Sequence, residues 1–536
     1  MKKYHVILLG LLLGFCLSGA ARERIYISTD RSAYVSGDLV WCSAFSLGGS
    51  QTCSGVAYLE LFSADGTAVQ AKIALVGGRG AGVLQLPASL PTGNYLLCAY
   101  TSGDDDRAAI LRDARILSVF NGFSTARVEN GVRVAAAVAP TRARDAGTLR
   151  VLATPASRGG ELSVELDNRL GKAMSLSVSV YHEDALAPEE EKGIADACTR
   201  VRLGTVEEEG DIIHAHLSGP DRDRALSRHP FAIISSPGNT EDLYTALFTQ
   251  SGRMSFRTYN IFGHRDLVCE VAGLDEAMDC YLELESPFLG LESRDIPQLT
   301  IDPAFEPGLL ERMAAIPSSR AAAADTLLAF LPKRESRLFG PDDPDCIRYR
   351  MADYTQMNTF HECVIEYIPE LRWRREGLQV LKSVGRGVNN LFAENVLVLI
   401  DGVPVLDHSS IIEMDATLLR EVDIFRRSYS IGARTYDAVV SLITTHRNLS
   451  TVRFPRTVRI FDFEGASYPL AYKRAPGQGQ DLRQTIYWHP SVQVEAGEAL
   501  RIPVQAPAYA GRFCVVVEGL DSDGLPVRQE TSVEVR

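Results

Sequence analysis

Short stretches of alternating apolar and polar residues, separated by turn residues, run through most of the chain. In the first hundred residues they include RIYIS (24–28), LVWCSAF (39–45), AYLELF (57–62) and YLLCAY (95–100). Further along, SLSVSVY (175–181) alternates strictly. Because successive side chains of a strand point to opposite faces, this pattern predicts half-buried strands packed as β-sandwiches.

The periodicity changes near residue 306. Helical spacing runs from Leu309 to Ile316, and the alanine-rich segment 320–330 is a good helix former. The next segment, 334–350, contains GPDDPD and is expected to be a linker, where a protease cut would release the sandwiches that precede it. A mixed α/β pattern follows, and strands return near the C-terminus.

These changes predict a mainly β protein, with several β-sandwich domains in tandem and one small α/β domain. The expected parts are a signal peptide (1–20), a first sandwich (22–121), a second sandwich (122–219), a third β-rich segment (220–300), a helical segment with a linker (301–350), the α/β domain (351–450) and a C-terminal sandwich (451–536).

The first twenty residues have the pattern of an export signal. KK (2–3) is followed by an apolar run over 6–17 and by small residues that predict cleavage after Ala20. Cys16 raises the question of lipid attachment, but Phe15 stands where that signal has a small residue. We therefore expect a periplasmic or outer-membrane-associated protein, and no later window is long and apolar enough for a transmembrane segment.

Charge and cysteine content exclude several classes of protein. Lys and Arg number 55 against 68 acidic residues, a net charge of −13, which argues against a nucleic-acid partner. The ten cysteines are too sparse for a disulfide scaffold. Cys42 with Cys98, or Cys269 with Cys280, are possible pairs in an oxidising compartment, but small buried hydrophobes are the favoured interpretation.

The N-terminal string IYISTDRSAYVSGDLVWCSAF (25–45) resembles the second macroglobulin-like domain of the alpha-macroglobulin family. The positions that match are Asp30, Tyr34, Gly37, Asp38 and Val40, with Arg31 in place of the usual Lys, Ser36 in place of the usual Pro, and PTGNY (91–95) matching a later strand. The resemblance implies a seven-stranded sandwich. It does not imply protease trapping, because the chain has no Cys-Gly-Glu-Gln thioester motif.

The string NVLVLIDGVPVL (395–406) and the residues up to 445 resemble the plug domain of TonB-dependent outer-membrane receptors. The residues predict a buried strand (396–400), a tight turn at Asp401-Gly402 and further strands at 421–425 and 439–444. Ala438 departs from the family's usual Gly. The family's plug sits in a large barrel, and the segment 451–536 is too short to supply one, so the resemblance implies a plug-like domain without its barrel.

The order of these domains, ending in VRIFDFEGASYPL (458–470), DLRQTIYWHPSV (481–492) and FCVVVEGLDSDGLPV (513–527), resembles secreted proteins of Bacteroidetes-type bacteria. That resemblance implies an architecture and little chemistry.

No group of residues predicts catalysis, cofactor binding or metal binding. His361-Glu362 and Glu366 lack the second imidazole of a zincin helix, and His214 with His216 is better explained as an exposed strand face. The other segments considered were GRGAG (78–82), read as a hairpin turn, GRG (385–387), the acidic Asp342, Asp343 and Asp345, and the basic cluster RWRR (372–375).

We therefore expect a non-enzymatic protein without cofactors that binds or scaffolds envelope or outer-membrane proteins. Two alternatives stay open. One is a protease-interacting, macroglobulin-like defence protein, and the other is an accessory component of an outer-membrane uptake system. The oligomeric state does not follow from the sequence.

Overall fold

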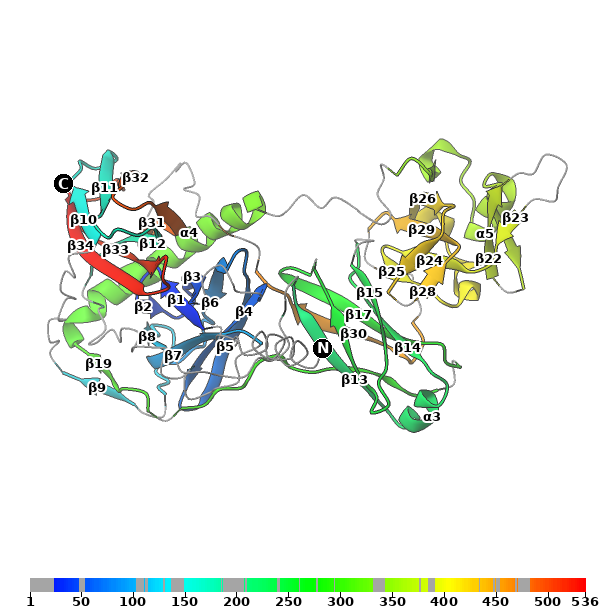
Figure 1. Ribbon diagram of the computed structural model, residues 1–536, viewed down its shortest axis with the longest axis horizontal. Coiled ribbons are helices and arrows are strands. Elements are labelled where there is room, and N and C mark those ends of the chain that lie inside the picture. Colours follow the sequence, from blue (N-terminus) through cyan, green and yellow to red (C-terminus); the bar gives the residue numbers. More distant parts are fainter. Residues whose placement is uncertain are drawn as a thin grey trace, which may run out of the picture. The chain divides into compact units, whose positions relative to one another are not determined.

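The structure is a computed structural model, and it shows a mainly β chain with tandem sandwiches and a smaller α/β module (Figure 1). The expected signal peptide lies outside the described residues. Those are 24–47, 54–102, 110, 114–128, 131–135, 149–184, 186, 207, 210–238, 242–259, 261–275, 278–293, 295–330, 343–375, 377–383, 391–432, 434–446, 449, 454–467, 470 and 483–536.

The first sandwich forms where the alternating strings predict it. Its three-stranded sheet has the order β1-β3-β6 and its five-stranded sheet the order β2-β8-β7-β4-β5. The strands are β1 (Ile25–Thr29), β2 (Ala33–Val35), β3 (Leu39–Ser46), β4 (Val56–Ser63), β5 (Gly66–Ala74), β6 (Arg79–Gln85), β7 (Gly93–Tyr100) and β8 (Arg115–Phe120). The inward-facing side chains of both sheets form one apolar core. The short β2 is an addition to the seven strands that the resemblance implied.

The second sandwich is assembled from two distant parts of the chain. Its sheets have the orders β10-β11-β32 and β31-β12-β33-β34. The strands are β10 (Leu149–Thr154), β11 (Glu161–Asn168), β12 (Met174–His182), β31 (Thr485–Val494), β32 (Ala499–Gln505), β33 (Gly511–Asp521) and β34 (Pro526–Val535). β12 therefore has a C-terminal strand on each side, and the core includes residues from both parts.

The third sandwich also takes a strand from further along the chain. Its sheets have the orders β16-β13-β18 and β15-β14-β17-β30. The elements are β13 (Ile212–Ser218), α3 (Arg222–Leu226), β14 (Phe231–Ser235), β15 (Leu243–Leu247), β16 (Arg253–Arg257), β17 (His264–Ala272), β18 (Tyr281–Leu284) and β30 (Val458–Glu464).

The sheets thus differ from the expected contiguous domains. The chain divides into two compact units, unit 1 (1–209, 288–331 and 466–536) and unit 2 (210–287 and 332–465). The expected C-terminal sandwich (451–536) contributes one strand to the third sandwich and four to the second. Alternation of polarity specifies which face of a strand is buried but not which strand lies beside it, and for this reason the contiguous assignment failed.

The predicted helix is α4 (Glu306–Phe330), which continues through Pro317 and belongs to unit 1. It is preceded by the 3-10 turn η3 (Pro303–Phe305) and by a parallel pair, β9 (Val132–Val134) with β19 (Leu299–Ile301). Arg312 on α4 is 3% exposed and bonds both Asp184 and the carbonyl of Ala33. None of the helices in the described ranges combines the length and the apolar character that a bilayer crossing requires.

The α/β module of unit 2 has a five-stranded sheet of order β20-β26-β29-β24-β25. The remaining strands form a three-stranded sheet and a hairpin. The elements are β20 (Cys346–Arg350), η4 (Met351–Asp353), α5 (Phe360–Glu366), β21 (Leu371–Arg374), β22 (Gly377–Ser383), β23 (Leu391–Ala393), β24 (Val396–Ile400), β25 (Val403–Pro404), η5 (His408–Ile411), η6 (Ala416–Leu418), β26 (Leu419–Phe425), β27 (Tyr429–Ile431), β28 (Arg434–Tyr436) and β29 (Ala438–Thr444).

Two expectations for this region have different outcomes. The strands and the turn expected between residues 396 and 444 are confirmed, since β24, β26 and β29 lie where the pattern placed them and the Asp401-Gly402 turn follows β24. The expected linker (334–350) is wrong at its end, because Cys346–Arg350 pairs with β26 as an edge strand. IRYR (347–350) alternates apolar or aromatic residues with arginines, which is the pattern of a half-buried strand, but the turn residues GPDDPD just before it favoured a linker.

The described cysteines are free thiols, so neither suggested disulfide is formed. They are Cys42, Cys98, Cys269, Cys280, Cys346, Cys363 and Cys514. Six of these seven are buried, which confirms the interpretation as small buried hydrophobes.

Candidate functional site

The residues of the N-terminal motif form a buried polar cluster in unit 1. The Asp30 carboxylate, on a residue 1% exposed, accepts hydrogen bonds from the Tyr34 hydroxyl (2.8 Å) and the Trp41 backbone N–H (3.0 Å). It also accepts one from the Thr485 hydroxyl at 2.5 Å, which comes from β31 of the second sandwich. Asp30 therefore fixes the turn between β1 and β3 and joins the two sandwiches.

The remaining charged residues of the motif pair with each other. Arg31 Nη2 lies 2.6 Å from Asp38 Oδ2, and both residues are buried. The Asp38 carboxylate also accepts from the Val35 N–H (3.3 Å), closing a turn in which Gly37 has a φ of +92°. Only glycine adopts this conformation without strain, which explains its place in the motif.

A second buried carboxylate, Glu518 on β33, joins the sandwiches at another point. It accepts hydrogen bonds from the hydroxyls of Ser28 (2.6 Å) and Tyr26 (3.0 Å) on β1. Arg115 of β8 lies 2.8 Å from the same carboxylate, and Arg528 of β34 lies 3.5 Å from it. The carboxylate is thus surrounded by donors from both sandwiches. An apolar contact accompanies it, with the rings of Trp41 and Trp488 5.2 Å apart.

The electrostatics of these clusters are those of a structural interface. Burial raises the pKa of Asp30, although Arg31 and the hydroxyl donors favour its carboxylate. Burial also raises the pKa of the Tyr26 hydroxyl and of the neighbouring Cys42 thiol, so neither supplies a nucleophile near neutral pH. The charged groups are enclosed by protein and form their ion pairs and hydrogen bonds within the clusters.

Sequence reasoning found most of the first cluster and none of the second. Asp30, Arg31, Tyr34 and Asp38 were singled out as a motif, but Thr485 on β31 was not, nor was any residue as a partner of Glu518. One signal was present: Glu518 interrupts the apolar run FCVVVEGL, and a charge inside such a run indicates a buried partner.

The segments considered for chemistry have structural roles. Glu362 forms the capping box of α5 with Thr359, so the His361-Glu362 pair marks a helix start. His214 contacts Ser255 (2.7 Å), and His216 lies 3.4 Å from Glu283. No cluster of three or more metal-ligating side chains occurs in the described ranges.

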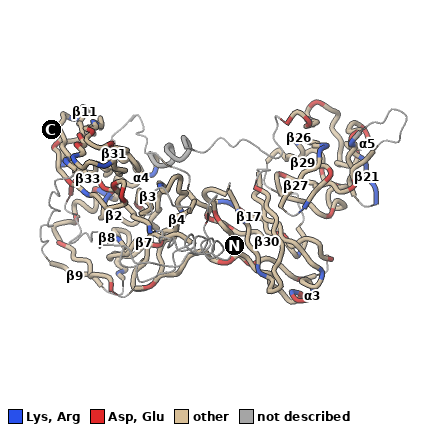
Figure 2. Tube along the Cα trace, in the orientation of Figure 1, with Lys and Arg blue, Asp and Glu red and all other residues tan. Residues whose placement is uncertain are grey.

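The other segments also have partners or lie outside the structure. Asp343 and Asp345 both pair with Arg427. Arg372 lies 3.4 Å above the Phe392 ring. Of the predicted hairpin turn 78–82, only Gly78 lies in the turn between β5 and β6, and the other four residues begin β6. Asp342 and residues 385–387 lie outside the described residues. Basic and acidic residues are interspersed along the described parts of both units (Figure 2).

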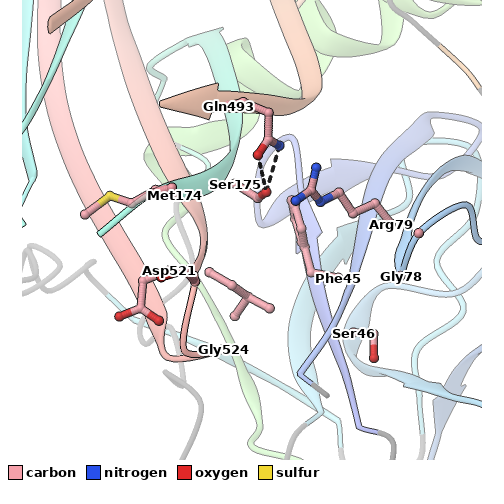
Figure 3. A pocket seen from close by; sticks show the side chains of 13 residues that line it. Phe45, Ser46, Gly78, Arg79, Met174, Ser175, Gln493, Asp521 and Gly524 are labelled. Atoms are coloured by element: carbon pink, nitrogen blue, oxygen red, sulfur yellow. Dashed lines mark hydrogen bonds between the residues drawn. The ribbon is translucent and has the colours of Figure 1, made fainter. Parts of the chain in front are cut away.

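Beside the Glu518 cluster, a cavity of about 310 Å³ opens between the first and second sandwiches of unit 1 (Figure 3). Phe45 and Leu520 line it, with the Gly77–Gly78 turn and Arg79 on one side. The Ser175 hydroxyl, also in the lining, lies 2.7 Å from Gln493 Nε2 and 2.9 Å from Gln493 Oε1. Charged, polar and apolar side chains therefore line a space of ligand size here.

Comparisons with known proteins find similarity among solved structures. No profile of a known protein family matches the chain, and no curated protein matches it. Among solved structures it is similar to native Escherichia coli alpha-2-macroglobulin at 9% identity, covering 97% of this chain and 40% of that one, with a TM-score of 0.24.

Two further structures show the same weak similarity. Salmonella alpha-2-macroglobulin reacted with methylamine gives 10% identity, 97% and 40% coverage and a TM-score of 0.24. The Yersinia pseudotuberculosis adhesin InvE gives 12% identity, 52% and 66% coverage and a TM-score of 0.15. The chain spans about 40% of the length of these alpha-2-macroglobulins. Because these TM-scores are low, the description of the fold rests on the sheets of this chain and not on the similarities.

Proposed function

We propose that the protein is an exported, non-enzymatic binding or scaffolding protein of the outer membrane or periplasm of a Gram-negative cell. The observation that carries the proposal is the course of the chain, which passes between unit 1 and unit 2 four times. Unit 2, which contains the α/β module, is therefore joined to unit 1 by four passages of the chain and is not a terminal appendage in the sequence. Unit 1, joined internally by the Asp30 and Glu518 clusters, serves as the platform.

The α/β module supplies the proposed binding part, and the residues that resemble a receptor plug form the strands β24, β25, β26 and β29 of its sheet. A buried β24 leads through the Asp401-Gly402 turn into β25, and β29 pairs parallel to β24. The inference from this likeness to an outer-membrane partner is an analogy, because a fold does not by itself define a function. It makes envelope proteins the partner class to test first.

Exposed apolar side chains on the module allow a sharp test. Tyr354 is 41% exposed and Ile365 is 65% exposed, whereas Tyr259 (41%) and Leu247 (59%) offer a matched pair on the third sandwich. We expect the tagged mature protein, cross-linked in cells, to retain a defined set of envelope proteins. The double variant Tyr354→Ala/Ile365→Ser should lose that set, and Tyr259→Ala/Leu247→Ser should keep it. Equal retention by both variants would argue against binding through the module.

The protease-interacting alternative has a separate test. A macroglobulin trap shields a captured protease from large substrates while leaving it active on small ones. We expect this protein to be cut without shielding the protease, because the chain has no thioester motif. A protease that loses activity on a large substrate but keeps it on a small peptide, after incubation with the mature protein, would support the alternative.

A further inference from the structure

The cavity between the first two sandwiches is independent of the proposed binding module, since every residue that lines it belongs to unit 1. The cavity lies between the ends of several strands: Phe45 and Ser46 end β3, Arg79 begins β6, and Met174 and Ser175 begin β12. Side chains supported by strands are held in place without a ligand, so the cost of organising the site has already been met by folding.

The charge in the cavity favours an anion. The Arg79 side chain is exposed and forms no ion pair with another described side chain. Asp521 is the carboxylate of the lining, but its Oδ1 accepts the backbone N–H groups of Asp523 and Leu525, 2.9 Å away in each case, and so closes its own turn. The positive guanidinium is therefore the charged group available to a ligand, and its planar fork fits a carboxylate.

The other lining groups favour a compact ligand with hydroxyl or amide groups. Figure 3 shows the Arg79 guanidinium extending toward the side of the cavity where Ser175 and Gln493 bond each other. These two side chains offer both donors and acceptors. Phe45 and Leu520, buried at 1% and 5% exposure, provide an apolar wall. A space of about 310 Å³ is at the small end of the range for ligand sites.

We propose that this cavity binds a small carboxylate about the size of one sugar ring, with Arg79 holding the carboxylate and the Ser175–Gln493 pair holding a hydroxyl or amide. Two sources share this chemistry, an acidic sugar and the free carboxyl end of a peptide. The experiment has an arm for each.

The test is ligand-observed NMR titration of the full mature protein with four probes. D-glucuronate is compared with D-glucose, and the dipeptide N-acetyl-Ala-Leu is compared with its C-terminal amide. We expect saturable binding of at least one carboxylate and none of its neutral partner. Arg79→Gln should weaken that binding about tenfold, the value expected for one charge-assisted contact. Ala173→Trp, which adds a large ring to the lining, should abolish it.

The matched control is Arg150→Gln, an exposed arginine on β10 outside the cavity lining. It should bind like the unmodified protein, and all variants should keep the same melting temperature. Three outcomes would overturn the proposal: no binding of either carboxylate, equal binding of the neutral partner, or equal loss in Arg150→Gln. Glucuronate binding alone identifies an acidic sugar, and dipeptide binding alone identifies a peptide end.

Discussion

At the scale of the residue, the buried carboxylates are the side chains from which the clearest effects on stability are expected. Asp30 and Glu518 lie almost without solvent access and are stabilised by donors from two sandwiches. Glu270, on β17 of the third sandwich, is also buried, at 8% exposure, but has no described cationic partner. A carboxylate that is buried without compensating donors favours the folded state only when it is protonated.

Glu518→Ala should destabilise unit 1 by about 3–5 kcal/mol, because it leaves Arg115 and the Tyr26 hydroxyl buried without their acceptor. Denaturant unfolding of the full mature chain measures the change. Glu161→Ala, at an exposed position of β11, is the control and should shift the free energy of unfolding by less than about 0.5 kcal/mol. Equal effects of the two substitutions would mean that the Glu518 cluster does not stabilise the contact between the first and second sandwiches.

Burial raises the pKa of Glu270 from 4.5 to about 7. The folded state therefore keeps a proton that the unfolded state loses, so the free energy of unfolding falls as pH rises from about 4.5 to 7 and stays low above that range. Glu270→Gln should remove this fall. The difference in free energy of unfolding between the variant and the unmodified protein should be about 3 kcal/mol more favourable to the variant at pH 8 than at pH 4. Unfolding curves of both proteins across this pH range measure the difference, and a difference that does not vary with pH would contradict the assignment.

At the scale of the element, the turns show what the sequence alone could predict. Asp401 and Gly402 have φ values of 49° and 85°, as the two-residue hairpin between β24 and β25 requires. The Asp401 carboxylate adds a hydrogen bond from the Thr444 N–H at 2.8 Å, which ties the turn to the end of β29. An Asp-Gly pair between apolar runs therefore predicted both the turn and its geometry.

Gly402→Val should destabilise unit 2 by about 1–3 kcal/mol, because a β-branched residue is strained at a φ of 85°. Thermal unfolding of the full chain should show the loss. Gly171→Val is the matched control: that glycine has an ordinary φ, and an added Cβ would meet nothing within 4 Å. Two melting curves shifted by the same amount would rule out strain at the hairpin as the cause.

The alternating strings predicted most strands of the sandwiches, and helical spacing predicted α4, because both patterns are local. Pairing was not predictable, because β11 and β12 have no local feature that names β32, β31 and β33 as neighbours. For the same reason the Asp30 motif was visible and Thr485 was not. The cavity beside Arg79 could not be predicted either, since its lining comes from five segments that only the pairing brings together.

At the scale of the whole molecule, the course of the chain changes what a cut can do. The sequence led to the expectation that cleavage near residues 340–345 would release the sandwiches before it. In the structure, β12 lies on one side of that cut in the sequence and both its neighbours, β31 and β33, lie on the other. The two fragments would share a complete sandwich.

A protease recognition sequence inserted between residues 334 and 340 tests this directly. After cleavage the fragments should co-elute in size-exclusion chromatography under native conditions and separate only in denaturant, because β12 keeps its hydrogen bonds to both neighbours. The uncut protein with the same insertion is the control. Fragments that elute separately under native conditions would show that the second sandwich is not held by these strands.

The divided second sandwich also governs the order in which a newly synthesised chain can fold. Ser175 on β12 and Gln493 on β31 are 318 residues apart, so the apolar face of β12 stays uncovered until the residues between them have been synthesised. Closing so long a loop is slow compared with pairing inside one hairpin. A chain interrupted before β31 therefore leaves the apolar face of β12 open to chaperones and proteases. A chain that carries β31 to β34 covers this face.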